Sequence, residues 1–236
     1  MEAGRAATPA PDGPTDRLGP PRPGIAVVFA GLSLVVIALS AWLAVQPRAQ
    51  AAQTALVQWF NEPPQPVATV FALVNPLLRP APLLVVALVL VGWVLVTAAQ
   101  ARQRLEVLRA AVLAYVLAEL MTQFLKRVAD QPRPLAVIPG LDTHGYPTSP
   151  RGNAYPSAHT AVAVAVVSAL WPWMSWPQRL VGATFAVLIA CNRVYIGAHW
   201  PVDVLGGAAI GLLSGALAWL VATRWPLHRL PHPSAP

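Results

Sequence analysis

The stretch NRVYIGAHWPVDVLGGAAIGLLSGALAWLV, residues 192–221, joins a polar cluster directly to an uninterrupted apolar run. The run at residues 204–221 carries no charge and is long enough to cross the hydrocarbon core of a bilayer. Polar side chains at the end of a membrane helix are costly unless they pair or serve a function. The stretch therefore predicts a spanning helix that begins beside a functional site.

Five other apolar runs of similar character precede this one. They lie at residues 25–45, 83–99, 107–125, 158–173 and 181–196. A further run at residues 67–78 is too short to span, and it follows a Pro-Pro pair, which indicates an interfacial or re-entrant helix. We therefore predict an all-α polytopic membrane helical bundle of six transmembrane helices plus this short helix.

The composition agrees with a membrane protein. Hydrophobic residues make up 56% of the 236 residues and charged residues only 11%, so the chain would be hard to keep soluble. We expect one membrane domain at residues 24–223, between disordered Pro-rich tails at residues 1–23 and 224–236. The net charge is +7, but no basic run or basic–aromatic stripe exists, so nucleic acid is not expected as a partner.

The basic residues orient the six predicted spans. With the N-terminus inside, nine lie in inner segments and seven in outer segments, and three of the outer seven, Lys126, Arg133 and Arg193, are explained by the chemistry described next. Setting those three aside leaves nine against four, which favours cytoplasmic termini because positive charge accumulates on the cytoplasmic side. The loop between the third and fourth spans then faces the periplasm or exterior of a plasma membrane.

Three polar clusters fall on that outer side. The first is KRVADQPRP, residues 126–134, and the second is PSAH, residues 156–159. The third places Arg193, His199 and Asp203 at spacings of six and four. Residues this far apart in the chain would converge near one membrane surface, which predicts a single site.

Cations in these clusters suit a phosphate group. Lys126, Arg133 and Arg193 can neutralise a tetrahedral dianion, and Arg side chains match phosphate oxygens in geometry. Ser157 and the amide of Ala158, at the start of a helix, can donate further hydrogen bonds. Three cations would repel a divalent ion, so neither a metal nor another cofactor is expected.

The two histidines supply the chemistry. His199 and Asp203 are four residues apart and so share a helix face, where Asp203 can fix the tautomer of the ring. The other ring nitrogen of His199 is then free to attack phosphorus. His159, from a different helix, can protonate the leaving oxygen and afterwards activate water. We expect a metal-independent reaction through a phosphohistidine.

These strings resemble the signature of the type 2 phosphatidic acid phosphatase family, which shares its core with vanadium-dependent haloperoxidases. The family pattern is Lys-x6-Arg-Pro, Pro-Ser-x-His and Ser-Arg-x5-His-x3-Asp. Ala158 stands where Gly is usual and Asn192 where Ser is usual. The resemblance implies an α-helical bundle with a membrane-surface site, in which Lys126, Arg133, Ser157 and Arg193 bind phosphate. It also implies that His159 is the general acid, His199 the nucleophile and Asp203 its partner.

Several alternatives remain at this level. A non-hydrolytic lipid-phosphate binder or transporter would use the same cations, although no inverted repeat is visible. A haloperoxidase would hold vanadate in the same cradle, but the many spans argue against it. The substrate is an undetermined lipid phosphate, such as undecaprenyl diphosphate, phosphatidylglycerophosphate or phosphatidic acid. Gly207, Gly211 and Gly215 form a bare helix face that either packs inside the bundle or makes a homodimer seam.

Overall fold

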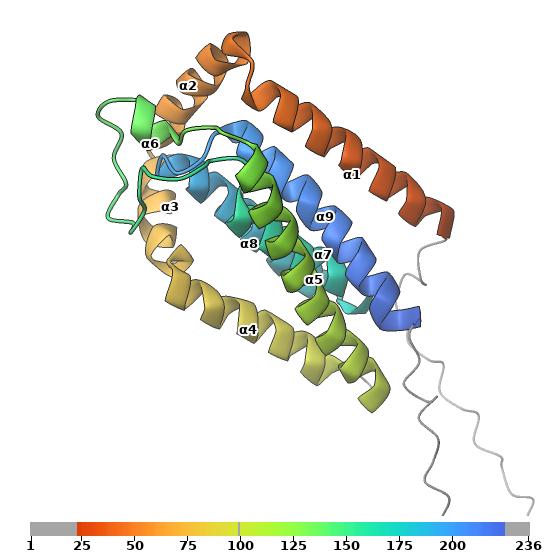
Figure 1. Cartoon of the computed structure of the whole chain (residues 1–236). Coiled ribbons are helices and arrows are strands. Elements are labelled where there is room, and N and C mark those ends of the chain that lie inside the picture. Colours follow the sequence, from red (N-terminus) through yellow and green to blue (C-terminus); the bar gives the residue numbers. More distant parts are fainter. Residues whose placement is uncertain (1–22, 99, 225–236) are drawn as a thin grey trace, which may run out of the picture.

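The apolar runs form helices that pack side by side in a bundle (Figure 1). The computed structural model describes residues 23–98 and 100–224. The predicted tails lie outside these residues, except that Pro23 and Arg224 are helical and belong to the bundle. The helices are α1 (Pro23–Ala44), α2 (Pro47–Asn61), α3 (Val67–Val74), α4 (Pro80–Thr97), α5 (Ala101–Val128), α6 (Pro134–Val137), α7 (Ala158–Leu170), α8 (Trp176–Tyr195) and α9 (Pro201–Arg224).

The predicted all-α class is confirmed for the described residues, which contain no β-strand. The six predicted spans coincide with α1, α4, α5, α7, α8 and α9. The short predicted helix at residues 67–78 is α3 continued by a 3-10 helix, η1 (Asn75–Leu78), and a second 3-10 helix, η2 (Trp171–Trp173), extends α7.

The number of membrane crossings is a separate matter from the number of helices. Among the described residues, only α9 is long and apolar enough to cross a bilayer by itself. The pair α1 and α2 would add one more crossing if its 93° bend belonged to a single span, and the apolar parts of α4 and α7 are shorter. Six crossings therefore stay a prediction.

Helix α2 has no counterpart among the predicted helices, because residues 46–66 lie between the apolar runs 25–45 and 67–78. Pro47 stands at its first position, where the missing N–H of proline is tolerated. Gln53, Val57 and Asn61 are its buried residues, and their spacing of four places them on one helix face. The segment is amphipathic rather than continuously apolar, so its sequence lacks the long apolar run by which the other helices were predicted.

The centre of the bundle is formed by α5, α7 and α9, while α1 packs on α9 and α8 packs on α7. Small side chains allow the close approach: Ala110, Ala114 and Ala118 on α5 are fully buried in the shared core. A Cβ atom at Gly211 of α9 would lie 2.6 Å from the carbonyl oxygen of Ala161 on α7. The glycine face of α9 thus packs against α7, which was the intramolecular alternative for these glycines. A homodimer stays a prediction, but this face is not available as its interface.

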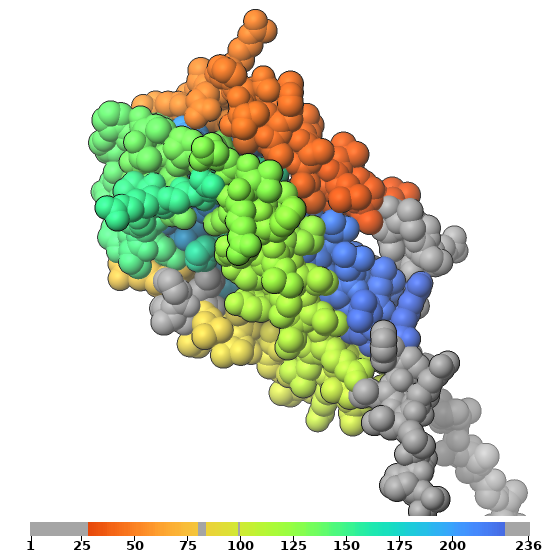
Figure 2. All heavy atoms as spheres, in the orientation of Figure 1, coloured from red at the N-terminus to blue at the C-terminus, as the bar shows by residue number. Residues whose placement is uncertain are grey.

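The outer surface of the bundle is apolar. Many large hydrophobic side chains are exposed on α1, α4 and α5, including Leu34, Leu88 and Leu120. The segment between α5 and α7, coloured green to teal, covers one end of the bundle (Figure 2). The molecule therefore has apolar sides and a loop-covered end, and the three polar clusters lie at that end.

Candidate active site

The three clusters are joined by hydrogen bonds where α5 ends and α7 and α9 begin. The Ser157 N–H donates to the carbonyl oxygen of Asp203 at 3.0 Å, which ties α7 to α9. The Asn153 side-chain amide donates to the carbonyl oxygen of Lys126 at 2.6 Å. The Trp200 indole donates to the carbonyl oxygen of Pro132 at 2.8 Å. Residues from all three clusters are thus fixed around one point.

His199 lies in the turn between α8 and α9. Gly197 ends α8 with a φ of 65°, a left-handed conformation that glycine adopts without strain. The carbonyl oxygen of Arg193 accepts the backbone N–H groups of Ala198 and His199, both at 3.1 Å. This short loop places the His199 backbone directly beside Arg193.

The predicted pairing of His199 with Asp203 is present as a close contact. His199 Nδ1 lies 3.4 Å from Asp203 Oδ2, and both side chains are buried. The Trp200 N–H donates to the same carboxylate oxygen at 2.7 Å, which holds the Asp203 side chain at the start of α9. The contact does not meet the geometry of a hydrogen bond, and His199 Nδ1 has no other hydrogen-bond partner among the described residues.

Burial lowers the pKa of His199 well below its ordinary value, and the positive charges of Lys126, Arg133 and Arg193 lower it further. These three side chains are thus near enough to the ring to affect its pKa. The pKa of Arg133 is also lowered, mainly by burial. The His199 ring is consequently neutral, the form in which one nitrogen keeps a free lone pair.

The second cluster begins α7. Ser157 is the residue before the first turn and is fully buried, and its Oγ accepts the hydroxyl proton of Thr160 at 3.0 Å. The Ser157 hydroxyl therefore keeps its own proton for another acceptor. Ala158 is the first residue of the helix and His159 the second, and His159 is only half-buried.

The two arginines are held differently. Arg133 Nη1 donates to the hydroxyl of Thr148 and the carbonyl oxygen of Ser149, at 3.3 and 3.0 Å. The Arg193 guanidinium carbon lies 4.2 Å from the centre of the Tyr146 ring. The Nε of each arginine is buried without a hydrogen-bond partner among the described residues. Both guanidinium groups thus retain donors for an anion.

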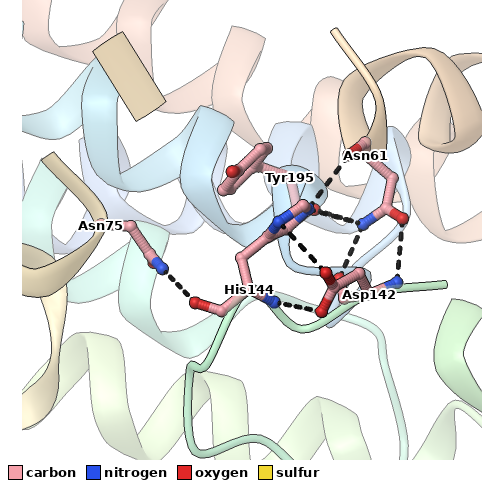
Figure 3. A network of polar contacts seen from close by, with 5 residues as sticks. All are labelled: Asn61, Asn75, Asp142, His144 and Tyr195. Atoms are coloured by element: carbon pink, nitrogen blue, oxygen red, sulfur yellow. Dashed lines mark hydrogen bonds and ion pairs between the residues drawn. The ribbon is translucent and has the colours of Figure 1, made fainter. Parts of the chain in front are cut away.

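The segment between α5 and α7, residues 129–157, is called the covering loop below. A polar network that was not predicted from the sequence anchors this loop (Figure 3). The side chain of Asn61 donates to the carbonyl oxygens of Asp142 and Tyr195, at 2.7 and 2.6 Å. The His144 ring stacks on Tyr195, with the ring centres 4.0 Å apart. Asn75 donates to the carbonyl oxygen of His144 at 2.9 Å. None of these residues belongs to a motif, so the sequence carried no signal for them.

The model of the PAP2 superfamily matches residues 107–226, which run from α5 through α9 and include all three clusters. The chain belongs to the PAP2 superfamily. The PAP2 match leaves out α1 to α4, so the helix α2 and the helix α3 lie outside the matched segment.

The chain is also similar to individual proteins, and the solved structures among them share its fold. An undecaprenyl-diphosphatase from Sulfolobus acidocaldarius is 29% identical over 125 residues, which cover 50% of this chain and 57% of that protein. The crystal structure of a transmembrane PAP2 type phosphatidylglycerolphosphate phosphatase from Bacillus subtilis has a TM-score of 0.58 at 21% identity. It covers 82% of this chain and 93% of that one. The crystal structure of Aquifex aeolicus LpxE has a TM-score of 0.55 at 25% identity. It covers 70% of this chain and 92% of that one.

The chain spans little more than half the length of the curated PAP2 relative. At 21% identity, the likeness to the Bacillus subtilis structure concerns the fold.

Proposed function

We propose that the protein is a membrane phosphatase that removes a phosphate group from a lipid through a phosphohistidine on His199. The observation that carries the proposal is the buried pair of His199 and Asp203, with Nδ1 3.4 Å from the carboxylate, at the point where the three polar clusters meet. A binder or transporter would need the cations but would have no use for a ring held in this way. Membership of the PAP2 superfamily agrees with the proposal.

In the first step, the His199 Nε2 lone pair attacks phosphorus and the bond from phosphorus to the lipid oxygen breaks. Asp203 stabilises the proton on Nδ1, so the ring accepts positive charge as the new N–P bond forms. His159 donates a proton to the departing oxygen, which leaves as an alcohol or a lipid phosphate. Lys126, Arg133 and Arg193, with Ser157 and the Ala158 amide, neutralise the charge on the transferring group.

In the second step, water attacks the phosphohistidine. His159, now neutral, accepts a proton from the water as the new O–P bond forms. The N–P bond breaks, its electron pair returns to Nε2 of His199, and inorganic phosphate leaves. The enzyme then has the protonation state from which it began, and no metal ion takes part.

The substrate class follows from the surroundings of the site. The apolar sides of the bundle would keep a lipid tail in the bilayer while its head group reaches the loop-covered end. We propose a lipid phosphomonoester or diphosphate, with polyprenyl diphosphate and phosphatidylglycerophosphate as the first to test because the named PAP2 relatives act on such compounds. Phosphate release by the purified protein across a panel of lipid phosphates tests the class.

Phosphate release should survive EDTA, because side-chain cations already balance the charge of the phosphate. Orthovanadate should inhibit, since its trigonal bipyramidal form resembles the transition state. Both are measured on the purified protein in detergent with the best lipid of the panel. Complete loss in chelator, restored by a divalent ion, would contradict the metal-free scheme.

We also propose that the site faces the periplasm or exterior of a plasma membrane and that both termini are cytoplasmic. The support is the distribution of basic residues, nine against four once the three proposed phosphate ligands are set aside. An outer site would act on head groups in the outer leaflet. That position suits the recycling of a lipid carrier used in envelope assembly.

A single cysteine tests this orientation. Pro150 is exposed in the covering loop, whereas the neighbouring Thr148 contacts Arg133 and is a poorer probe. In a Cys191→Ala background, Pro150→Cys should react with an impermeant maleimide in intact cells. Labelling that appears only after the membrane is broken would show that the loop faces the cytoplasm, which contradicts the proposed orientation.

A further inference from the structure

Two buried amides connect Arg193 to the covering loop. Arg193 Nη2 donates to Asn192 Oδ1 at 2.8 Å, and Asn192 Nδ2 donates to Asn75 Oδ1 at 2.8 Å. Asn75 Nδ2 then donates to the backbone oxygen of His144 at 2.9 Å, as Figure 3 shows. The exposed fractions of Arg193, Asn192 and Asn75 are 3%, 0% and 4%, so water does not compete for these bonds. We call these three bonds the amide relay.

The direction of the amide relay is fixed by its two ends. A guanidinium group only donates and a backbone carbonyl only accepts. Asn192 must therefore present its oxygen to Arg193 and its nitrogen to Asn75. Asn75 must likewise accept on one side and donate on the other. Neither amide can flip without placing two donors or two acceptors in contact, so the relay has a single arrangement.

The covering loop also holds Arg193 from its flat face. The Tyr146 ring lies under the guanidinium carbon at 4.2 Å, and the Tyr146 hydroxyl donates to the carbonyl oxygen of Leu78 at 3.0 Å. Tyr146 and His144 belong to one turn, closed by a bond from the Tyr146 N–H to the carbonyl oxygen of Thr143. The same turn thus contacts Arg193 by stacking and, through Asn75, by hydrogen bonding.

These contacts leave the Nε–H of the guanidinium unpaired among the described residues. Nη2 is engaged by Asn192, whereas Nε is buried without a partner among the described residues. A buried donor without an acceptor is unfavourable until an acceptor arrives. The Nε–H of Arg193 is therefore available, before any ligand binds, to donate to an anion.

We propose that Asn75 and Asn192 are positioning residues. Through the amide relay they hold the Arg193 guanidinium in the orientation that binds phosphate. The proposal rests on the proposed phosphatase function and adds two residues that touch no substrate atom. It also explains Asn192, which stands where the resembled family motif has Ser. A Ser side chain can accept from Arg193, but it lacks the second group that reaches Asn75.

A double-mutant cycle tests the relay in the purified full-length protein. Orthovanadate affinity is measured by calorimetry for wild type, Asn75→Ala, Arg193→Ala and the double variant, and kcat and KM are measured where turnover remains. Asn75→Ala should weaken vanadate binding roughly tenfold in the wild-type background, within the range of coupled pairs. In the Arg193→Ala background it should change the affinity by less than about twofold, because the group through which it acts is gone.

Gln178→Ala is the matched control. Gln178 is another fully buried amide on α8, but it bonds Thr97 and Ser175 at the opposite end of the helix. This variant should lower the thermal midpoint while leaving the vanadate affinity of the folded protein unchanged. Should Asn75→Ala not fold, Asn192→Ser breaks the same link with a smaller change and enters the same cycle.

Two outcomes would overturn the amide relay. In one, Asn75→Ala binds vanadate as well as wild type does. In the other, it weakens binding equally with and without Arg193, as a purely structural residue would. A wild-type protein that neither binds vanadate nor releases phosphate would instead refute the proposed function, and the relay with it.

Discussion

Replacing His199 with alanine should lower phosphate release by roughly four orders of magnitude or more, because the proposed covalent nucleophile is lost. The protein should still fold, since the removed ring makes no hydrogen bond that holds the turn: the turn is held by the backbone bonds to Arg193. Initial rates on the best lipid phosphate and the thermal midpoint in detergent measure the two effects separately. A variant that keeps a tenth of the wild-type rate would contradict the phosphohistidine scheme.

Trapping the intermediate makes the assignment more specific. With p-nitrophenyl phosphate, whose leaving group needs no proton, His159→Ala should still form the phosphohistidine but hydrolyse it slowly. Rapid quenching with alkali should therefore reveal an acid-labile phosphoenzyme in His159→Ala. The double variant that also carries His199→Ala should show none. Label retained in that double variant would place the phosphate on another residue.

The second large effect concerns the contact between α7 and α9. Gly211→Val should leave little folded protein, because even a Cβ atom at this position would lie 2.6 Å from both the Ala161 oxygen and the Val164 Cβ. Backbone atoms cannot yield as side-chain ends do, and overpacking typically costs about 1–3 kcal/mol or more. Detergent-stable yield by size-exclusion chromatography measures the loss.

Gly92→Val is the matched control for this substitution. Gly92 lies in α4, and nothing stands within 4 Å of a Cβ atom built there. The control should give near wild-type yield and activity, because it changes the same residue type in a helix without a clash. Equal yields from Gly211→Val and the control would mean that α7 and α9 are not packed as closely as described here.

The helices of the bundle were predictable because each is marked by its own apolar run. Helix α2 was not, because its buried face alternates with polar residues and its mean hydropathy is low. The number of membrane crossings could not be predicted from apolar runs alone. Helix α5, for example, carries Arg109 and Glu119 within its length. It is therefore not apolar enough to be identified as a membrane span by composition.

The motif residues were predictable because their spacing is short and regular. The residues that hold them were not, because their partners are distant in the chain. Asn61 bonds Asp142 and Tyr195 across 81 and 134 positions, and Asn75 bonds Asn192 across 117. Such pairs depend on how α2, α3 and α8 pack, which no local pattern contains. Tyr146 under Arg193 is of the same kind.

Helix α2 lies outside the segment that matches the family, yet it contacts the start of α9 and the covering loop. Gln53 of α2 accepts the N–H of Val202 in the first turn of α9, and Asn61 anchors the covering loop. Substitutions at these amino-terminal positions would therefore alter the surroundings of the proposed site without changing any residue of the family segment.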